Sequence, residues 1–192
     1  MKASTSPMRQ TLMDTALHLL CTKGYNKLSY ADLAVAVGLR KASIHYHFPA
    51  KVDLGLALME QQQERLEQQL QSIQARYSHS QDKLKAFSAL FTQPVAEYFP
   101  LCSVLATEMG CLPEPMQEAT QSFIQGQLHW LTQVIETGQQ NGEILTPGLA
   151  AGLAFDFLSL LEGACLLKRS LPLSPTHLSC TVERLFAFRA QV

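Results

Sequence analysis

The sequence of 192 residues predicts an all-α protein. Apolar residues recur at helical spacing through nearly the whole chain, whereas the apolar–polar alternation of half-buried strands is missing. Asn-Gly turns between such strands are missing as well. Glycines and prolines punctuate the helical pattern, and we expect about nine helices.

The first three expected helices have the order and spacing of a helix-turn-helix unit. A helix over residues 9–23 ends at Gly24, where a helix C-terminus favours a residue that adopts positive φ. A second, short helix begins after Ser29, whose hydroxyl is a suitable N-cap, and ends at Gly38. A third short helix follows over residues 41–48, where a proline stops it.

The remaining helices are longer and form the body of the protein. We expect them at residues 51–77, 81–98, 101–110, 115–139, 147–167 and 175–189. The helix at 147–167 is apolar nearly all round, so one side can face the core and the other a partner.

The charges are divided unevenly along the chain. The whole chain has a formal charge of −1, but residues 1–55 contain seven Lys or Arg and three Asp or Glu. This segment therefore carries +4 and the remainder −5. A basic N-terminal segment on an acidic body suggests that the N-terminal segment meets an anionic partner.

Cysteine use and the polar N-terminus predict a reduced, cytoplasmic protein. The five cysteines are an odd number without a CxxC pair, and residues 1–7 do not resemble a signal peptide. The apolar run at 149–167 contains Asp156 and Glu162, and a charge at the centre of a spanning helix costs roughly 2.5–3.5 kcal/mol. We expect this run to be buried in protein rather than in a membrane.

Residues 24–51 read GYNKLSYADLAVAVGLRKASIHYHFPAK, and this segment resembles the DNA-binding domain of the TetR family of transcriptional regulators. The resemblance covers about the first quarter of the chain. Both the residues at the turns and the polar residues of this segment match the family's pattern. The resemblance implies a DNA-binding domain at 1–52 and a ligand-binding and dimerisation domain at 53–192. It also implies a regulator, more often a repressor, that binds a palindromic DNA operator as a dimer and is released by a small-molecule inducer.

A recognition helix places its N-terminal residues toward base edges, while neighbouring groups hold phosphates. Lys41 is the best candidate to read a base, because a well-aligned lysine contact to guanine discriminates by roughly 1–3 kcal/mol. By the family's pattern, phosphate contacts come from residues at the starts of the second and fourth helices and at the end of the third. The candidate DNA-binding residues are Ser29, Tyr30, Arg40, Lys41, Ala42, Ser43, His45, Tyr46, His47 and Lys51. Ile44 and Phe48 are expected in the core.

Metal binding and catalysis lack support in the sequence. The side chains of residues two apart on a helix point about 200° away from each other. His45 and His47 therefore cannot hold one ion. HExxH, GxxxxGK[ST] and GxSxG motifs do not occur, and we expect no cofactor and no enzyme activity. An enzyme with Asp156 or Glu162 in an apolar pocket remains an alternative.

In the family the body encloses a ligand pocket. The candidate wall residues, which by default are ordinary core, are Phe91, Tyr98, Phe99, Met109, Phe123, Trp130 and Phe155. Because this set is uncharged, we expect an apolar or aromatic inducer.

The last two helices, at 147–168 and 175–189, are expected to form the homodimer interface, as they do in related regulators. Gly152, Asp156, Ser159 and Gly163 recur at helical spacing and would let a second helix approach closely. The alternative is that a helix of the same chain fills this stripe.

Two cysteines suggest a further alternative. Cys102 and Cys111 bracket a short segment that resembles the Cys-led segment of TetR-like repressors that sense electrophiles. A redox or electrophile sensor using Cys102 is one alternative, although a buried cysteine more often acts as a small hydrophobe. A TetR-like protein that serves as a DNA-tethered scaffold is another.

Overall fold

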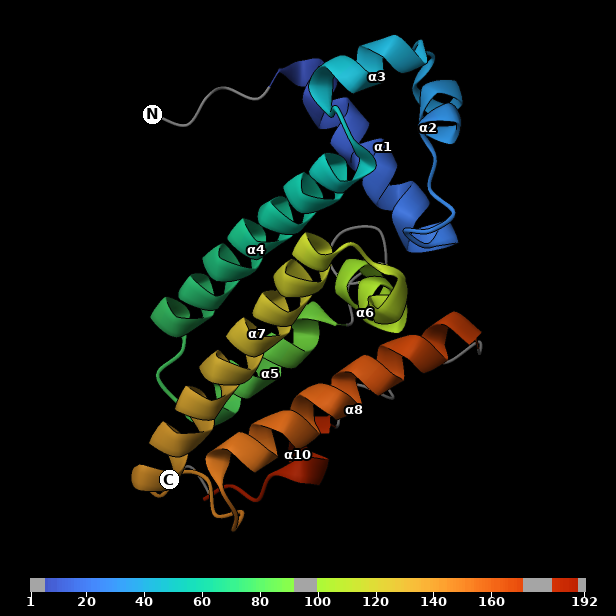
Figure 1. The fold of residues 1–192 in the computed structure, drawn as a ribbon. Helices are drawn as coiled ribbons and strands as arrows, with labels where there is room; N and C mark the ends of the chain where they lie inside the picture. Colours follow the sequence, from blue (N-terminus) through green and yellow to red (C-terminus); the bar gives the residue numbers. More distant parts are fainter. Residues whose placement is uncertain (1–5, 92–99, 171–180, 190–192) are drawn as a thin grey trace. The chain divides into compact units, whose positions relative to one another are not determined.

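The computed structural model describes residues 6–91, 100–170 and 181–189 of the chain (Figure 1). Its helices are α1 (Pro7–Lys23), α2 (Tyr30–Val37), α3 (Lys41–His47), α4 (Lys51–Arg76), α5 (Ser80–Leu90), α6 (Pro100–Thr107), the 3-10 helix η1 (Met109–Cys111), α7 (Glu114–Gln140), α8 (Ala150–Ser170) and α10 (Thr181–Leu185). The predicted all-α class is confirmed. Within the described ranges, the β-structure is limited to one isolated bridge between Ile144 and Phe188. The C-terminal part of the helix expected at 81–98 and the start of the last expected helix lie outside the described residues.

The chain divides into two compact units. Unit 1 comprises residues 1–64 and 100–122, and unit 2 comprises residues 65–99 and 123–192. The helices α4 and α7 therefore contribute to both units. The expected boundary at residue 52 stays a prediction, because it separates a DNA-binding domain from a ligand-binding domain by function, whereas these two units are defined by packing.

In unit 1, glycines end the first two helices as the sequence predicts. Gly24 has φ +87° and its N–H donates to the carbonyl of Leu20, which closes the last turn of α1. Gly38 has φ +70°, the left-handed conformation that a residue without Cβ adopts easily. The core of α1 is Leu12, Met13, Ala16 and Leu20. Both helices therefore end at the glycines that the sequence indicates.

Unit 2 is centred on aromatic side chains. Phe87 stacks on Trp130 with ring centroids 5.5 Å apart, and it also lies 6.3 Å from Phe157. Phe186 meets Phe157 edge to face at 5.5 Å. Aromatic pairs in these geometries add to the stabilisation that burial provides. The cluster connects α5, α7 and α8 with the residue that follows α10.

A carboxylate from the α7–α8 connection fixes the start of α5. The Ser80 N–H donates to Oε2 of Glu143 at 2.7 Å, and His79 Nδ1 lies 3.5 Å from Oε1. Burial of this carboxylate opposes its ionisation, but the hydrogen bonds from Ser80 and His79 outweigh it and lower the pKa of Glu143. The backbone carbonyl of Glu143 also accepts the Arg189 N–H at 2.9 Å, so one residue joins α5 to the C-terminal segment.

The helix α8 has one buried and one exposed face. Ala154, Phe157, Leu158 and Leu161 are buried. The opposite face is exposed and contains Gly152, Phe155, Ser159, Leu160, Gly163, Leu166 and Leu167, which we call the α8 face. Residues Ala150–Leu167 have a mean hydropathy of 1.6, and their length and composition alone would allow them to cross a membrane.

Candidate nucleic-acid interface

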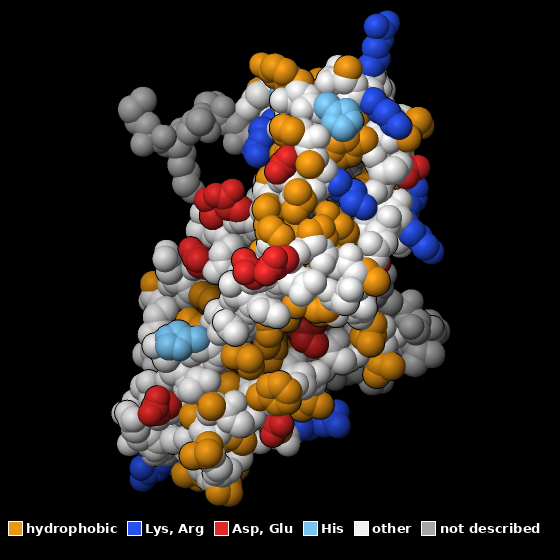
Figure 2. Space-filling view, viewed as in Figure 1, with side chains coloured by type: hydrophobic (Ala, Val, Ile, Leu, Met, Phe, Trp, Pro, Cys, Tyr) orange, Lys and Arg blue, Asp and Glu red, His pale blue; other side chains and the backbone are white. Residues whose placement is uncertain are grey.

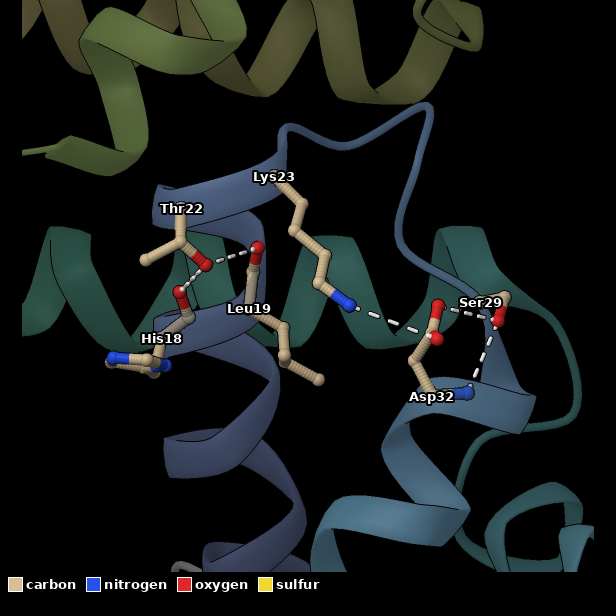
Figure 3. Close-up of polar contacts among 6 residues, drawn as sticks. All are labelled: His18, Leu19, Thr22, Lys23, Ser29 and Asp32. Atoms are coloured by element: carbon tan, nitrogen blue, oxygen red, sulfur yellow. Dashed lines mark hydrogen bonds and ion pairs between the residues drawn. The ribbon is translucent and has the colours of Figure 1, made fainter.

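The start of α2 is held by a side-chain cap. The Ser29 hydroxyl accepts the N–H of Asp32 at 3.1 Å and donates to Oδ2 of Asp32 at 2.8 Å (Figure 3). Lys23, the last residue of α1, lies 3.7 Å from Oδ1 of the same carboxylate. The hydrogen bond from Ser29 and, secondarily, the charge of Lys23 lower the pKa of Asp32. Ser29, a candidate phosphate contact, is therefore exposed but already engaged in the cap.

The helix α3 separates core residues from candidate DNA-binding residues. Ile44 is fully buried and Phe48 is 1% exposed, as the sequence predicts. The exposed residues on the other sides of the helix, which we call the α3 surface, are Arg40, Lys41, Ala42, Ser43, His45 and Tyr46. Tyr46 is 85% exposed, which is unusual for a large aromatic ring. Figure 2 shows Lys and Arg side chains gathered over the helices of this N-terminal part.

The two histidines of α3 have different surroundings. Nδ1 of His45 lies 3.0 Å from the carbonyl oxygen of Pro49, so the tautomer that has its hydrogen on Nδ1 donates to that carbonyl. The His45 ring meets the Tyr30 ring edge to face at 4.8 Å. His47 is half-buried and packs against the ring of Tyr46 at 5.2 Å. The described residues contain no group of three His, Cys, Asp or Glu side chains placed to hold a metal ion.

Tyr30 points into unit 1, although the sequence predicts that it contacts phosphate. Its side chain is largely buried, and its hydroxyl lies 2.9 Å from the carbonyl oxygen of Phe48 and 2.7 Å from that of Ala50. Burial and, to a smaller extent, the charge of Asp53 raise the pKa of Tyr30 to about 12. The hydroxyl therefore connects the start of α2 to the α3–α4 turn.

Lys51 also turns inward, although it is a candidate phosphate contact. Its Nζ donates to the carbonyls of Tyr25 at 3.0 Å and Leu28 at 3.3 Å, and lies 4.4 Å from the centre of the Tyr25 ring. Burial lowers the pKa of Lys51, and the negative charge of Glu108 partly offsets this. The ammonium group therefore stabilises the loop between α1 and α2.

Glu108 is a residue that the sequence reasoning missed. It lies between α6 and η1, and its Oε2 accepts the N–H groups of Tyr25 at 2.8 Å and Asn26 at 3.2 Å. These two groups follow the C-terminus of α1 and need an acceptor. No local pattern points to a carboxylate more than eighty residues away in sequence, so only the structure reveals the pairing.

The candidate ligand-wall residues are not all placed together. Phe91 and Phe123 are buried in unit 2, and Trp130 is half-buried there. Met109 belongs to unit 1, and Phe155 is 61% exposed on the α8 face. The remaining two candidates, Tyr98 and Phe99, lie outside the described residues. Three of the seven candidates therefore share the interior of unit 2.

The two cysteines of the candidate sensor differ in exposure. Cys102 is only 5% exposed near the start of α6, whereas Cys111 is exposed at the end of η1. Modification by an electrophile or oxidant requires access to the sulfur. The position of Cys102 is that of a small buried hydrophobe, so its exposure does not favour the sensor alternative.

The fold and this surface define a helix-turn-helix protein with an additional helical body. The family model described as "Bacterial regulatory proteins, tetR family" matches residues 12–58. The Staphylococcus aureus regulator IcaR, described as a biofilm operon HTH-type negative transcriptional regulator, is 39% identical over 44 residues. That match covers 23% of this chain and 24% of IcaR, so it concerns the N-terminal part alone.

Solved structures extend the similarity over nearly the whole chain. A TetR-family transcriptional regulator from Agrobacterium tumefaciens has a TM-score of 0.87 at 29% identity, covering 93% of this chain and 97% of that one. A TetR transcriptional regulator from Legionella pneumophila has a TM-score of 0.79 at 29% identity, covering 96% and 97%. Residues 12–58 thus match the TetR family of bacterial regulatory proteins, and the chain as a whole has the fold of TetR-family regulators.

Proposed function

We propose that this protein is a DNA-binding transcriptional repressor that recognises a palindromic operator as a homodimer and releases it on binding a small molecule. The observation that carries the proposal is the α3 surface, where polar and basic side chains are exposed while Ile44 and Phe48 anchor the helix from behind. Repression is supported by the similarity of the N-terminal part to IcaR, a negative regulator.

The first turn of α3 supplies the proposed base contacts. Arg40, Lys41, Ala42 and Ser43 are exposed at the end of the helix that enters a major groove in helix-turn-helix proteins. Lys41 donates to guanine O6 and N7, and the small Ala42 lets the helix approach closely or contacts a thymine methyl group. These residues would determine which sequence is bound.

The surrounding side chains divide into two groups. Ser29, His45, Tyr46 and His47 are accessible enough to contact phosphates, and such contacts position a protein without reading sequence. The polar atoms of Tyr30 and Lys51 face inward, so we assign these two residues a structural role instead of a phosphate contact. They hold α2, the α1–α2 loop and the α3–α4 turn in place behind the α3 surface.

The α8 face supports the proposed homodimer. Its side chains are small or apolar and lie along one side of a long helix. A Cβ added at Gly152 or Gly163 would meet no described atom within 4 Å. Such a face lets a second helix approach closely. Asp156 is exposed on the same side of α8, next to the residues of the α8 face, and its charge favours a protein partner over lipid. The other part of the proposed interface, at 175–189, lies partly outside the described residues.

A dimer gives the ligand a way to act. Two recognition helices must be about 34 Å apart to enter successive major grooves. A small molecule that binds better to a dimer with another spacing weakens operator binding by that difference in affinity. The aromatic interior of unit 2 is the proposed ligand region, and the reducing cytoplasm, where such regulators meet DNA, is the proposed location.

The test is selection of bound duplexes from a random DNA library by the full-length protein, followed by a salt titration of the best duplex. The proposal predicts a two-fold symmetric sequence whose affinity falls with salt as phosphate contacts are screened. If binding stays weak and strongly salt-dependent and no sequence is enriched, the regulator proposal fails. The scaffold alternative would then explain the retained fold.

A further inference from the structure

An unusual polar side chain lies in the interior of unit 2. Gln127, on α7, is 1% exposed, and neither its Nε2 nor its Oε1 has a hydrogen-bond partner among the described residues. The buried hydroxyls of Thr120 and Ser88 are paired: Thr120 donates to the Met116 carbonyl at 2.7 Å, and Ser88 to the Lys85 carbonyl at 2.8 Å. Oε1 of Gln62 and of Gln69 on α4 are also unpaired, but Gln127 is unpaired at both of its amide atoms. Buried polar groups in native proteins are nearly always satisfied, so an amide with both atoms unpaired needs an explanation.

The surroundings of Gln127 are apolar. Phe123 and Leu131, four residues away on either side, lie on the same side of α7 and are 5% and 0% exposed. Trp130, three residues on, stacks on Phe87. A trapped water needs two to four polar partners, and among these three neighbours the indole N–H of Trp130 is the one polar side-chain group. The partner of this amide is therefore better supplied by a molecule that brings its own polar group.

We propose that Gln127 is the polar anchor of a ligand site in unit 2, and that its ligand is a neutral, largely aromatic molecule carrying an amide-like group. This inference deepens the proposed function and rests on it, because the ligand would be the inducer. A primary amide presents one acceptor and two donor hydrogens and remains uncharged at all ordinary pH values. A carboxamide, lactam or urea group on the ligand complements this side chain, because each has a hydrogen-bond donor next to an acceptor.

The ligand is expected to be neutral because the proposed anchor carries no charge. A buried anion or cation would require an opposite charge or several hydrogen bonds, and Gln127 provides no charge. Oε1 of Gln127 is itself an unpaired acceptor, so it favours a ligand with at least one N–H or O–H group.

The first experiment uses the ligand-free full-length protein and compares Gln127→Met with Gln125→Met. Methionine replaces the amide by an apolar chain of similar length, and Gln125 is exposed two residues away on the same helix. If the amide is held ready for a ligand, its replacement removes an unsatisfied polar group. The melting temperature of Gln127→Met should then rise by roughly 2–4 °C, whereas Gln125→Met should leave it nearly unchanged. A lower melting temperature for Gln127→Met would mean that the amide is a paired part of the fold, and would overturn the proposal.

The second experiment uses benzamide, benzoate and toluene as fragment probes at millimolar concentration. Benzamide should raise the melting temperature of the wild-type protein more than toluene or benzoate does. Its affinity should fall about tenfold in Gln127→Met, while that of toluene should not. Equal responses of the two proteins to benzamide, including no response in either, would overturn the proposal.

Operator binding separates this inference from the function on which it rests. Ligand-free Gln127→Met should bind the selected duplex as the wild type does. If it does so while the probe experiments fail, the assignment of Gln127 is wrong and the regulator proposal stands. If the wild-type protein itself selects no duplex, the proposed function fails regardless of how the probes bind.

Discussion

The carboxylate of Glu108 accepts the backbone N–H of Tyr25 at 2.8 Å, and this bond fixes the chain where it leaves α1. The preceding residue, Gly24, has positive φ, and a Cβ there would collide with the same carboxylate. The hydrogen bond and the glycine together position the loop that leads to α2. Within unit 1, the orientation of the helix-turn-helix therefore depends on a residue beyond α6.

Replacement of Glu108 by alanine should destabilise the protein. The N–H groups of Tyr25 and Asn26 would lose their acceptor, and an unpaired, partly buried donor costs roughly 1–3 kcal/mol. Urea unfolding of Glu108→Ala against Glu118→Ala, whose side chain is exposed on α7, measures the difference. Equal stabilities of the two variants would show that the carboxylate does not hold the loop.

Tyr30→Phe should lower stability by about 1 kcal/mol, because the hydroxyl that joins α2 to the α3–α4 turn is lost. The pKa of Tyr30 is raised from 10.0 to about 12, so the folded state favours the protonated hydroxyl. This contribution to stability is complete below about pH 10 and is lost as the pH rises toward 12. Unfolding between pH 8 and pH 12 should therefore show a steeper alkaline loss for the wild type than for Tyr30→Phe, and parallel curves would contradict the assignment.

Lys51→Met tests whether this lysine supports the loop or contacts DNA. Since Nζ donates to the carbonyls of Tyr25 and Leu28, we expect a lower melting temperature and an unchanged salt dependence of operator binding. Lys27→Met, which changes an exposed lysine of the same loop, should not lower the melting temperature. A phosphate contact by Lys51 would give another result: full stability, with the salt slope reduced by about one.

Gly163→Leu should weaken the homodimer while leaving the protomer folded. A Cβ at Gly163 meets no described atom within 4 Å, and leucine favours the helical conformation more than glycine does. Light scattering over a concentration series should show the dimer dissociating at a concentration at least tenfold higher than for the wild type. Ala106→Leu, which adds bulk at an exposed position of α6, serves as the control. A dimer unaffected by Gly163→Leu would place the interface elsewhere.

Local signals predicted the helix-turn-helix well because its elements are defined by nearby residues. Gly24 and Gly38 end the first two helices at the predicted positions, and Ser29 caps α2 as expected. Ile44 and Phe48 are buried, as their spacing along the third helix indicates. In each case the structural reason lies within a few residues of the signal.

Side-chain directions that depend on distant residues were harder to predict. Lys51 is basic and lies near the candidate interface, but carbonyls of the α1–α2 loop determine where its ammonium points. In α8, an apolar pattern all round the helix does not show which side is inward. The structure buries Phe157 and exposes Phe155, the residue predicted to line the ligand pocket.

The base preference of Lys41→Ala, compared with that of the wild type on the same random duplex library, tests the central claim most directly. We expect the wild type to enrich a two-fold symmetric sequence with a guanine in each half-site. In Lys41→Ala the preference for that guanine should flatten while neighbouring positions keep theirs, with roughly 1–3 kcal/mol of discrimination lost. Identical preferences in the two proteins would contradict the assignment of Lys41 as a base-reading residue, and the absence of any enriched sequence would contradict the proposed regulator itself.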